Sequence, residues 1–348
     1  MKITIFSECP DPNYYQSLYY LKELGKVIIS VYDSRFLYLL VKFFGFGKIS
    51  KKVMLQDLLR SFFAPFILLF KRDIIVGFAP YSIWVYYLLL LKLLNKNMIY
   101  VTSWPYWDNK GKYIHSSFFT RWFWLLFLKD IKVITPTVTV AHVIKKYRGN
   151  VKVIPHGINL NLFFPKRIKH RGMRILYVGR LVEEKGIYDL ITIAKKFENN
   201  HSVEFWVVGG GRLENLKEKK IPNLKFFGEI KDKEKLAEIY NSCDILILLS
   251  KKIKKWEEFF GIVLIEAMAT GTPVIAFDNV GPREILSGGL GGFLIQKEDK
   301  EEVYNKIKLI MNNPSKRKEL SLSAIKVASR FDMSKLSAQW LEILSENN

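Results

Sequence analysis

The amino-acid sequence predicts an α/β protein built of two Rossmann-like domains. Short apolar runs alternate with segments of helical pattern, which is typical of a parallel sheet covered on both faces. The alternation stops and restarts once, around KRIKHRG at 166–172, which we expect to be an exposed, charged linker. A length of 348 residues is enough for two domains, each with its own core. We therefore expect two sheets of parallel strands that face each other across a cleft.

The first domain is expected over residues 1–165. Its strands are predicted at KITIF, KVIISVY, DIIVGF, MIYVTSW and KVITP. Residues 74–91 carry no charge, so a membrane span is an alternative there. Gly77, Pro80 and Ser82 interrupt this segment, and we interpret it as a strand, a turn and a helix.

The second domain is expected over residues 166–332. Its strands are predicted at MRILYVGR, EFWVVGGG, KFFGEI, DILILLS, PVIAF and GFLI. From Glu301 onward the pattern is helical. Open parallel sheets bind ligands beyond the carboxyl ends of their strands, so the turns after these strands are the places to look for a site.

Composition excludes several classes of protein. The two cysteines, Cys9 and Cys243, are far apart and lack partners at metal-ligand spacing. This argues against a disulfide framework and a zinc site, and it favours a reducing cytoplasm. The start, MKITIFSECPDP, lacks the continuous apolar core of a signal peptide.

Positive charge is concentrated in the first half of the chain. Residues 1–166 hold 23 Lys and Arg against 8 Asp and Glu, a net charge of +15, whereas residues 167–348 have a net charge of +6. Aromatic clusters lie beside these cations, at 43–52, at 60–72 (RSFFAPFILLFKR) and at 118–129 (FFTRWFWLLFLK). Basic residues that border aromatic and leucine clusters suit a peripheral membrane surface. Nucleic acid is the competing partner, but we find no motif for it and expect none to bind.

The stretch most informative about function is EEFFGIVLIEAMATGTPVIAFDNVGPRE, at 257–284. Gly261 allows a backbone conformation and a close approach of a ligand that a side chain would prevent. A helix is expected from Ile262 to Ala269. Its first turn would present unpaired N–H groups and the positive end of the helix dipole, which suit a diphosphate.

Two carboxylates are placed around that helix start. Glu258 precedes it and Glu266 lies about a turn and a half inside it, so both could face one ligand. A carboxylate there would accept hydrogen bonds from ribose or sugar hydroxyls. The alternative is a buried strand, turn and helix in which both glutamates are merely solvated.

Two further turns follow strands in the second domain. RILYVGRLVEEKGIYDLI at 174–191 puts Gly179 and Arg180 directly after a strand and Lys185 at the head of a helix. VVGGGRLE at 207–214 is a glycine turn, and by itself it is weak evidence for nucleotide binding.

These segments resemble the donor-site signature of the family four retaining glycosyltransferases, among the group 1 glycosyltransferases, which have the two-domain GT-B fold. The match runs almost unbroken from Glu257 to Ile285, and GRL with EKG matches the family's diphosphate-binding motif. The resemblance implies that residues 1–165 bind the acceptor and 166–332 the donor. It also implies that the last helix, 333–348, packs back on the first domain.

The resemblance carries roles for individual residues. It implies that Arg180 and Lys185 bind the diphosphate, that Glu266 binds ribose and that Glu258 binds the sugar. Arg180, Lys185 and Glu258 are the expected catalytic residues, and no metal ligand is expected. The expected donor-binding residues are Gly179, Arg180, Lys185, Gly209, Gly210, Glu258, Phe260, Gly261, Ile262, Val263 and Glu266.

The chain departs from the family pattern in several places. Val280 stands where a second glycine is usual, and SKKIKKWEE at 250–258 replaces a short proline-serine turn. We interpret this basic loop as solvated, with contact to the acceptor or a membrane as the alternative. Ser103 and Trp104 occupy what corresponds to a usual His-Asp pair, and His156 is interpreted as a structural turn residue.

The expected activity is that of a retaining hexosyltransferase. It would use a nucleotide diphospho-sugar such as UDP- or GDP-hexose without metal or cofactor, and it would act on a lipid-linked glycan or polysaccharide precursor. The expected location is cytoplasmic, peripheral on the inner membrane face. The alternatives are a sugar-nucleotide epimerase or hydrolase of the same fold, and a non-catalytic membrane-associated scaffold that binds sugar nucleotides.

Overall fold

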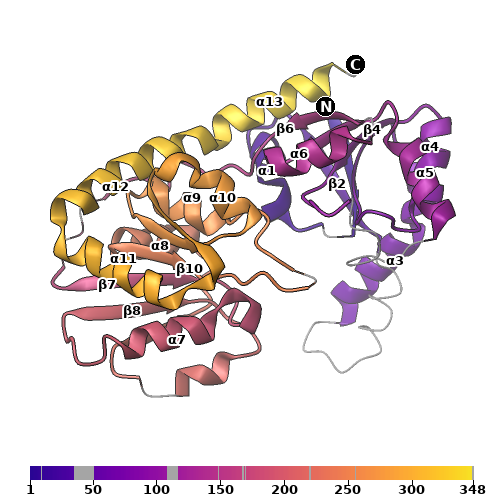
Figure 1. Cartoon of the computed structure of the whole chain (residues 1–348). Coiled ribbons are helices and arrows are strands. Elements are labelled where there is room, and N and C mark those ends of the chain that lie inside the picture. Colours follow the sequence, from indigo (N-terminus) through magenta and orange to yellow (C-terminus); the bar gives the residue numbers. More distant parts are fainter. Residues whose placement is uncertain are drawn as a thin grey trace. The chain divides into compact units, whose positions relative to one another are not determined.

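The computed structural model describes residues 1–8, 10–34, 51–107, 117–147, 149–166, 168, 170–218, 221–254 and 256–346. The chain divides into two compact units, residues 1–156 with 334–348, and residues 157–333 (Figure 1). Each unit contains one parallel sheet, which confirms the predicted α/β class. Cys9 and most of the aromatic cluster at 43–52 lie outside the described residues.

The first unit is built on a sheet of six parallel strands in the part of the chain that is described. Their order is β2-β1-β3-β4-β5-β6. The strands are β1 Lys2–Ser7, β2 Ile28–Asp33, β3 Asp73–Gly77, β4 Asn97–Val101, β5 Lys132–Thr135 and β6 Asn150–Val153. The helices are α1 Gln16–Glu23, α3 Lys51–Leu68, α4 Val85–Leu93, α5 Phe118–Leu128, α6 Val138–Lys145 and α13 Met333–Ser345.

Alternating residues of the strands fill two cores in the first unit. In β1, Phe6 packs with α3, α4 and α5 on one face, whereas Ile3 and Ile5 pack with α1 and α13 on the other. Leu336 and Trp340 bring α13 into this second core. The uncharged segment at 74–91 is a strand, a turn and a helix, and no helix among the described residues is long and apolar enough to cross a membrane.

The second unit repeats the plan, with six parallel strands among its described residues in the order β12-β11-β10-β7-β8-β9. The strands are β7 Met173–Val178, β8 Val203–Val208, β9 Leu224–Gly228, β10 Ile245–Leu248, β11 Val274–Phe277 and β12 Gly292–Ile295. The helices are α7 Ile187–Lys195, α8 Lys233–Asn241, α9 Ile262–Ala269, α10 Val280–Ile285, α11 Lys300–Asn312 and α12 Pro314–Ala328. Strands β10 and β11 are buried along their whole length, as expected for strands covered on both faces.

The division between the units differs from the boundary expected at residue 165. It falls between His156 and Gly157, and again between Met333 and Ser334. Ile158 explains the difference, because its N–H donates to Phe331 O at 2.8 Å and its carbonyl accepts the N–H of Met333 at 2.9 Å. Residues 157–165 are therefore fastened to the second unit.

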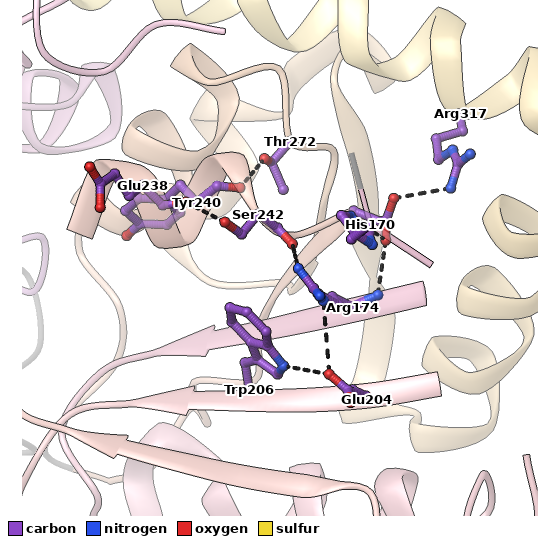
Figure 2. Close-up of polar contacts among 10 residues, drawn as sticks. His170, Arg174, Glu204, Trp206, Glu238, Tyr240, Ser242, Thr272 and Arg317 are labelled. Carbon is purple, nitrogen blue, oxygen red and sulfur yellow. Dashed lines mark hydrogen bonds and ion pairs between the residues drawn. The ribbon is translucent and has the colours of Figure 1, made fainter. Parts of the chain in front are cut away.

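A cluster of charged side chains joins the amino ends of β7 and β10 to neighbouring segments through hydrogen bonds and ion pairs (Figure 2). Asp244, directly before β10, accepts the N–H of Arg174 at 2.9 Å and lies 3.1 Å from Arg317 Nη1 on α12. His170 Nε2 lies 3.6 Å from the same carboxylate, and the His170 side chain is 11% exposed. This part of 166–172 is thus packed on the second unit, unlike the exposed linker expected from the sequence.

Candidate functional site

The turn after β7 carries two of the predicted cations. Gly179 and Arg180 follow the strand directly, and the Tyr177 hydroxyl donates to Arg180 O at 3.0 Å. The Arg180 side chain is exposed. Lys185 ends a short 3-10 helix, and Gly186 follows in the left-handed region with φ 75°. A Cβ on Gly186 would lie 2.1 Å from Leu249 O, so glycine lets this turn lie directly against the end of β10.

Lys185 and Glu258 are brought together although they are far apart in the sequence. Lys185 Nζ lies 2.5 Å from Glu258 Oε2, with both side chains mostly buried. The Ser250 hydroxyl donates to the same carboxylate oxygen at 2.8 Å. The N–H of Glu258 donates to Asn279 Oδ1 at 3.2 Å. The carboxylate is therefore fixed beside the turn after β7.

Glu257, the neighbour of Glu258, points into the protein instead. Its side chain is 1% exposed, and one carboxylate oxygen accepts the N–H of Val280 at 3.2 Å. Burial raises the pKa of the Glu257 carboxyl. The two adjacent glutamates thus differ, and Glu258 is the one at the strand-end turn.

Glu266 lies on α9 and is almost fully buried. Its Oε2 accepts the Tyr240 hydroxyl at 2.9 Å, and its Oε1 accepts Lys233 Nζ at 2.8 Å. Burial and the Glu266 carboxylate raise the pKa of Tyr240 well above its ordinary value, so the phenol remains a donor. Lys233 itself is about half exposed, at 45%. A ligand could therefore displace the lysine more readily than the tyrosine.

The start of α9 matches the turn predicted for a diphosphate. Gly261 takes the N-cap position with φ 90°, and no side chain caps the helix. The N–H groups of Ile262 and Val263 belong to the first helical turn, which has no carbonyl one turn earlier to accept them. Phe260 is different, since its side chain is buried and its ring lies 5.9 Å from that of Phe331.

The glycine turn after β8 lies against the turn after β7. Gly209 has φ 143°, and a Cβ on it would lie 1.9 Å from Gly179 O. The N–H of Leu181 donates to Gly210 O at 2.8 Å. The carboxyl ends of β7 and β8 are thus joined through backbone contacts, and the close approach at Gly209 needs glycine.

The structure therefore groups the predicted residues around two carboxylates. Lys185, from the loop that begins with Gly179 and Arg180, lies at Glu258, and Glu266 is held separately by α8 residues. Sequence reasoning missed four side chains that hold Glu258 and Glu266, namely Lys233, Tyr240, Ser250 and Asn279. Ser250 and Asn279 follow β10 and β11, so their positions at strand ends were an available signal.

The basic loop before Glu258 is not simply solvated. Lys251 Nζ lies 3.0 Å from Asp189 Oδ2, and Lys185 Nζ lies 4.9 Å from the centre of the Trp256 ring. This corrects the interpretation from the sequence, because the loop packs on the turn that carries Lys185.

In the first unit, His156 closes a small pocket at the carboxyl ends of β4, β5 and β6. Tyr14, Thr135 and Trp340 are among the other lining residues. Burial lowers the pKa of His156 from 6.5 to about 4, so the imidazole is neutral at physiological pH. The Tyr14 ring lies 5.3 Å from the imidazole, which agrees with a packed turn residue.

The candidate site in the second unit offers cations and helix N–H groups for a diphosphate, and carboxylates for hydroxyl groups. Among the residues with described positions, no cluster of three or more His, Cys, Asp or Glu is arranged to hold a metal ion.

Comparison with known proteins gives a family for the second unit. The family model "Glycosyl transferases group 1" matches residues 159–327. A phosphatidyl-myo-inositol mannosyltransferase of Mycobacterium leprae is 27% identical over 203 residues, which cover 55% of this chain and 52% of that protein. The chain spans about half the length of the curated relatives it matches.

Solved structures share the fold over nearly the whole chain. Sucrose-phosphate synthase from Thermosynechococcus elongatus has a TM-score of 0.74 at 18% identity, covering 99% of this chain and 98% of that one. HepE from Anabaena, solved in complex with UDP-glucose, has a TM-score of 0.70 at 17% identity and covers 99% and 100%. Residues 159–327 match the group 1 glycosyltransferase family, and the two parallel sheets of the chain have the GT-B fold.

Proposed function

We propose that this chain is a retaining glycosyltransferase that moves a hexose from a nucleotide diphospho-sugar to a hydroxyl group of an acceptor. The observation that supports this most directly is the meeting of Lys185 and Glu258 beside the Gly179–Arg180 turn. The chain spans about half the length of its curated relatives, so the activity itself is part of the proposal. In this proposal the second unit binds the donor and the first unit binds the acceptor.

The proposed chemistry depends on charge placed before the reaction begins. The bond between the anomeric carbon and the diphosphate oxygen breaks, and its electron pair goes to the leaving diphosphate. Arg180, Lys185 and the first N–H groups of α9 would stabilise that charge. The acceptor oxygen bonds to the same face of the sugar, and its proton passes to an oxygen of the leaving diphosphate. We assign no side chain as the base, and the two cations of the chain stand in place of a metal.

Glu266 would bind the ribose hydroxyls and Glu258 the sugar hydroxyls. Each carboxylate oxygen can accept more than one hydrogen bond, so a hydroxyl can join the partners already there or replace a lysine. Lys233 is half exposed and is the more easily displaced partner of Glu266. The UDP-glucose bound to HepE supports a nucleotide diphospho-sugar as the donor class.

The donor site is tested by calorimetric titration of UDP, GDP, ADP and their hexose forms. We expect micromolar binding of one nucleotide series to the wild type and its loss in Glu266→Ala. Arg180→Ala is expected to lower turnover about 10²-fold or more, as removal of one charge-stabilising donor does in other enzymes. Near-normal turnover of Arg180→Ala would contradict this mechanism.

Product analysis separates the enzyme from its alternatives. Sugar released or converted without any acceptor would favour the epimerase or hydrolase. Tight nucleotide-sugar binding without turnover, over a range of acceptors, would favour the scaffold.

We further propose a lipid-linked glycan or polysaccharide precursor as the acceptor, at the cytoplasmic face of a membrane. The name of the Mycobacterium leprae relative supports a lipid acceptor for that protein. The support in this chain is an apolar surface on three helices of the first unit. Its exposed members on or just after α3, α4 and α5 are Leu59, Phe62, Phe63, Phe66, Phe70, Tyr86, Leu90, Leu93, Leu94, Phe118, Phe119, Trp122, Leu125 and Leu126.

The exposed residues on these helices recur at spacings of three and four, so each helix has an apolar stripe toward solvent besides its buried one. The three helices pack together, because the Tyr87 hydroxyl of α4 donates to Pro65 O of α3 and the ring of Tyr86 lies 5.1 Å from that of Phe123 on α5. Arg72 and Lys129, after α3 and α5, are exposed cations. Aromatic side chains beside cations suit anionic lipid headgroups.

Sedimentation with vesicles of phosphatidylcholine and phosphatidylglycerol tests the membrane surface. We expect binding at low salt that weakens roughly tenfold or more when Phe118 and Phe119 are both changed to Ser. The matched control is Leu322→Ser, which changes an exposed apolar residue of the second unit. Absence of wild-type binding, or a stable dimer that needs Phe118 and Phe119, would overturn this part of the proposal.

A further inference from the structure

The segment between β10 and Glu258 forms a small hairpin. The N–H of Ile253 donates to Trp256 O at 2.9 Å, and the N–H of Trp256 donates back to Ile253 O at 3.2 Å. This pair of bonds is an antiparallel bridge, which holds Ile253 and Trp256 opposite each other. The position of Trp256 is therefore set by backbone hydrogen bonds.

The side of the hairpin that precedes Ile253 is anchored to the second unit. The N–H of Lys251 donates to Glu184 O at 2.8 Å, and Lys251 Nζ pairs with Asp189 at 3.0 Å. The N–H of Lys252 donates to Glu298 Oε1 at 2.9 Å. Glu184 is the immediate neighbour of Lys185, so the hairpin is fixed to the turn whose cation it approaches.

The Trp256 ring and the Glu258 carboxylate hold the same ammonium group. Lys185 Nζ lies 4.9 Å from the centre of the ring and 2.5 Å from Glu258 Oε2. The Lys185 side chain is only 16% exposed, so little water competes for its charge. The face of an indole attracts a cation, and the attraction grows as water is excluded.

We propose that Trp256 is a positioning residue of the donor site, which orients Lys185 toward the diphosphate. This inference rests on the proposed function. The two partners of Lys185 differ in one respect: Glu258 neutralises the cation, whereas the uncharged ring orients it and leaves its charge available to a phosphate. When Glu258 turns to a sugar hydroxyl, the ring keeps the lysine in place.

A double-mutant cycle tests the inference with the nucleoside diphosphate that the wild type binds. Trp256→Ala is expected to weaken binding about tenfold, and Trp256→Phe, which retains an aromatic face, to recover most of that loss. In a Lys185→Met background, Trp256→Ala is expected to change affinity less than twofold, because the ring then has no cation to orient.

The matched control is Trp206→Ala. Its ring lies 4.6 Å below the Arg174 guanidinium, a pair of the same kind near the amino end of β7. We expect this control to affect thermal stability without changing nucleotide affinity. Equal losses from Trp256→Ala with and without Lys185, or wild-type affinity in Trp256→Ala, would overturn the inference alone. Failure of the folded wild type to bind any nucleotide diphosphate or its sugar would instead overturn the proposed function, and the inference with it.

Discussion

Lys185 and Glu258 form an ion pair, with 2.5 Å between the ammonium nitrogen and a carboxylate oxygen. The resemblance assigns one of them to the diphosphate and the other to the sugar. Each side chain therefore gives the other an opposite charge in the place of its expected ligand. This pairing lowers the free-energy cost of keeping two charges mostly buried. Binding of the proposed donor must either break this ion pair or add its phosphate and hydroxyl groups as further partners of the two side chains.

Glu258→Gln tests this exchange. Removing the negative charge frees Lys185 for phosphate, so affinity for the nucleoside diphosphate is expected to rise about fivefold. Transfer of the sugar is expected to fall about tenfold or more, because a charged acceptor for a sugar hydroxyl is lost. Calorimetry and a transfer assay measure the two effects. Glu183→Gln, on the exposed side of the same turn, is the charge-matched control. A fall in nucleotide affinity in Glu258→Gln would contradict the exchange.

The neighbouring glycines Gly209 and Gly210 provide a second prediction. An alanine at 209 would need a backbone that L residues rarely adopt, and its Cβ would lie 1.9 Å from Gly179 O. We expect Gly209→Ala to cost about 3 kcal/mol or more of unfolding free energy and to abolish donor binding, because the turn after β7 must move. The measurements are urea denaturation and nucleotide titration.

Gly210→Ala is the matched control for that change. Its Cβ would come closer than ordinary van der Waals contact only to the flexible Glu214 side chain, with Oε1 at 2.6 Å. A carboxylate on an exposed loop can rotate away, so we expect a cost below about 1 kcal/mol. Similar losses in both variants would show that the close contact between the two turns is unimportant.

The pH dependence of stability should report on His156. Burial lowers its pKa to about 4, below the value of 6.5 for an unperturbed histidine. The unfolded chain therefore binds the proton more readily, and His156 makes stability fall as pH drops from about 6.5 toward 4. The full contribution is on the order of 3 kcal/mol. Denaturant unfolding at pH 7 and pH 5 should show a smaller difference in His156→Asn than in the wild type. An equal difference in both would assign the effect to other groups.

The fold, and the turns of the chain that form the candidate site, were predictable from local patterns. The alternation of strands and helices predicted both sheets, and the glycines located the turns after β7 and before α9. Gly261 takes a positive φ value, which is the backbone freedom expected for it from the sequence.

The partners of the carboxylates were not predictable, because they depend on packing between distant segments. Lys233 and Tyr240 reach Glu266 only because α8 and α9 pack together. The unit boundary was misplaced for the same reason, since the bonds of Ile158 join the two ends of the second unit. A sequence pattern shows the periodicity within one segment. It does not show which residues of distant segments contact each other.

Asp244 provides a last prediction, on stability without effect on the site. Its carboxylate accepts the N–H of Arg174 at 2.9 Å and lies 3.1 Å from Arg317 Nη1, at the amino ends of the strands. Asp244→Asn retains the shape but removes the charge that the Arg317 guanidinium and the N–H of Arg174 share, so we expect a loss of about 1 to 3 kcal/mol. Nucleotide affinity should remain unchanged, because donor residues lie at the carboxyl ends. Glu302→Gln, in an exposed pair with Lys306 at 3.9 Å, is the control and should cost at most about 0.5 kcal/mol. Equal losses in the two variants would mean that the cluster contributes no more than a surface ion pair.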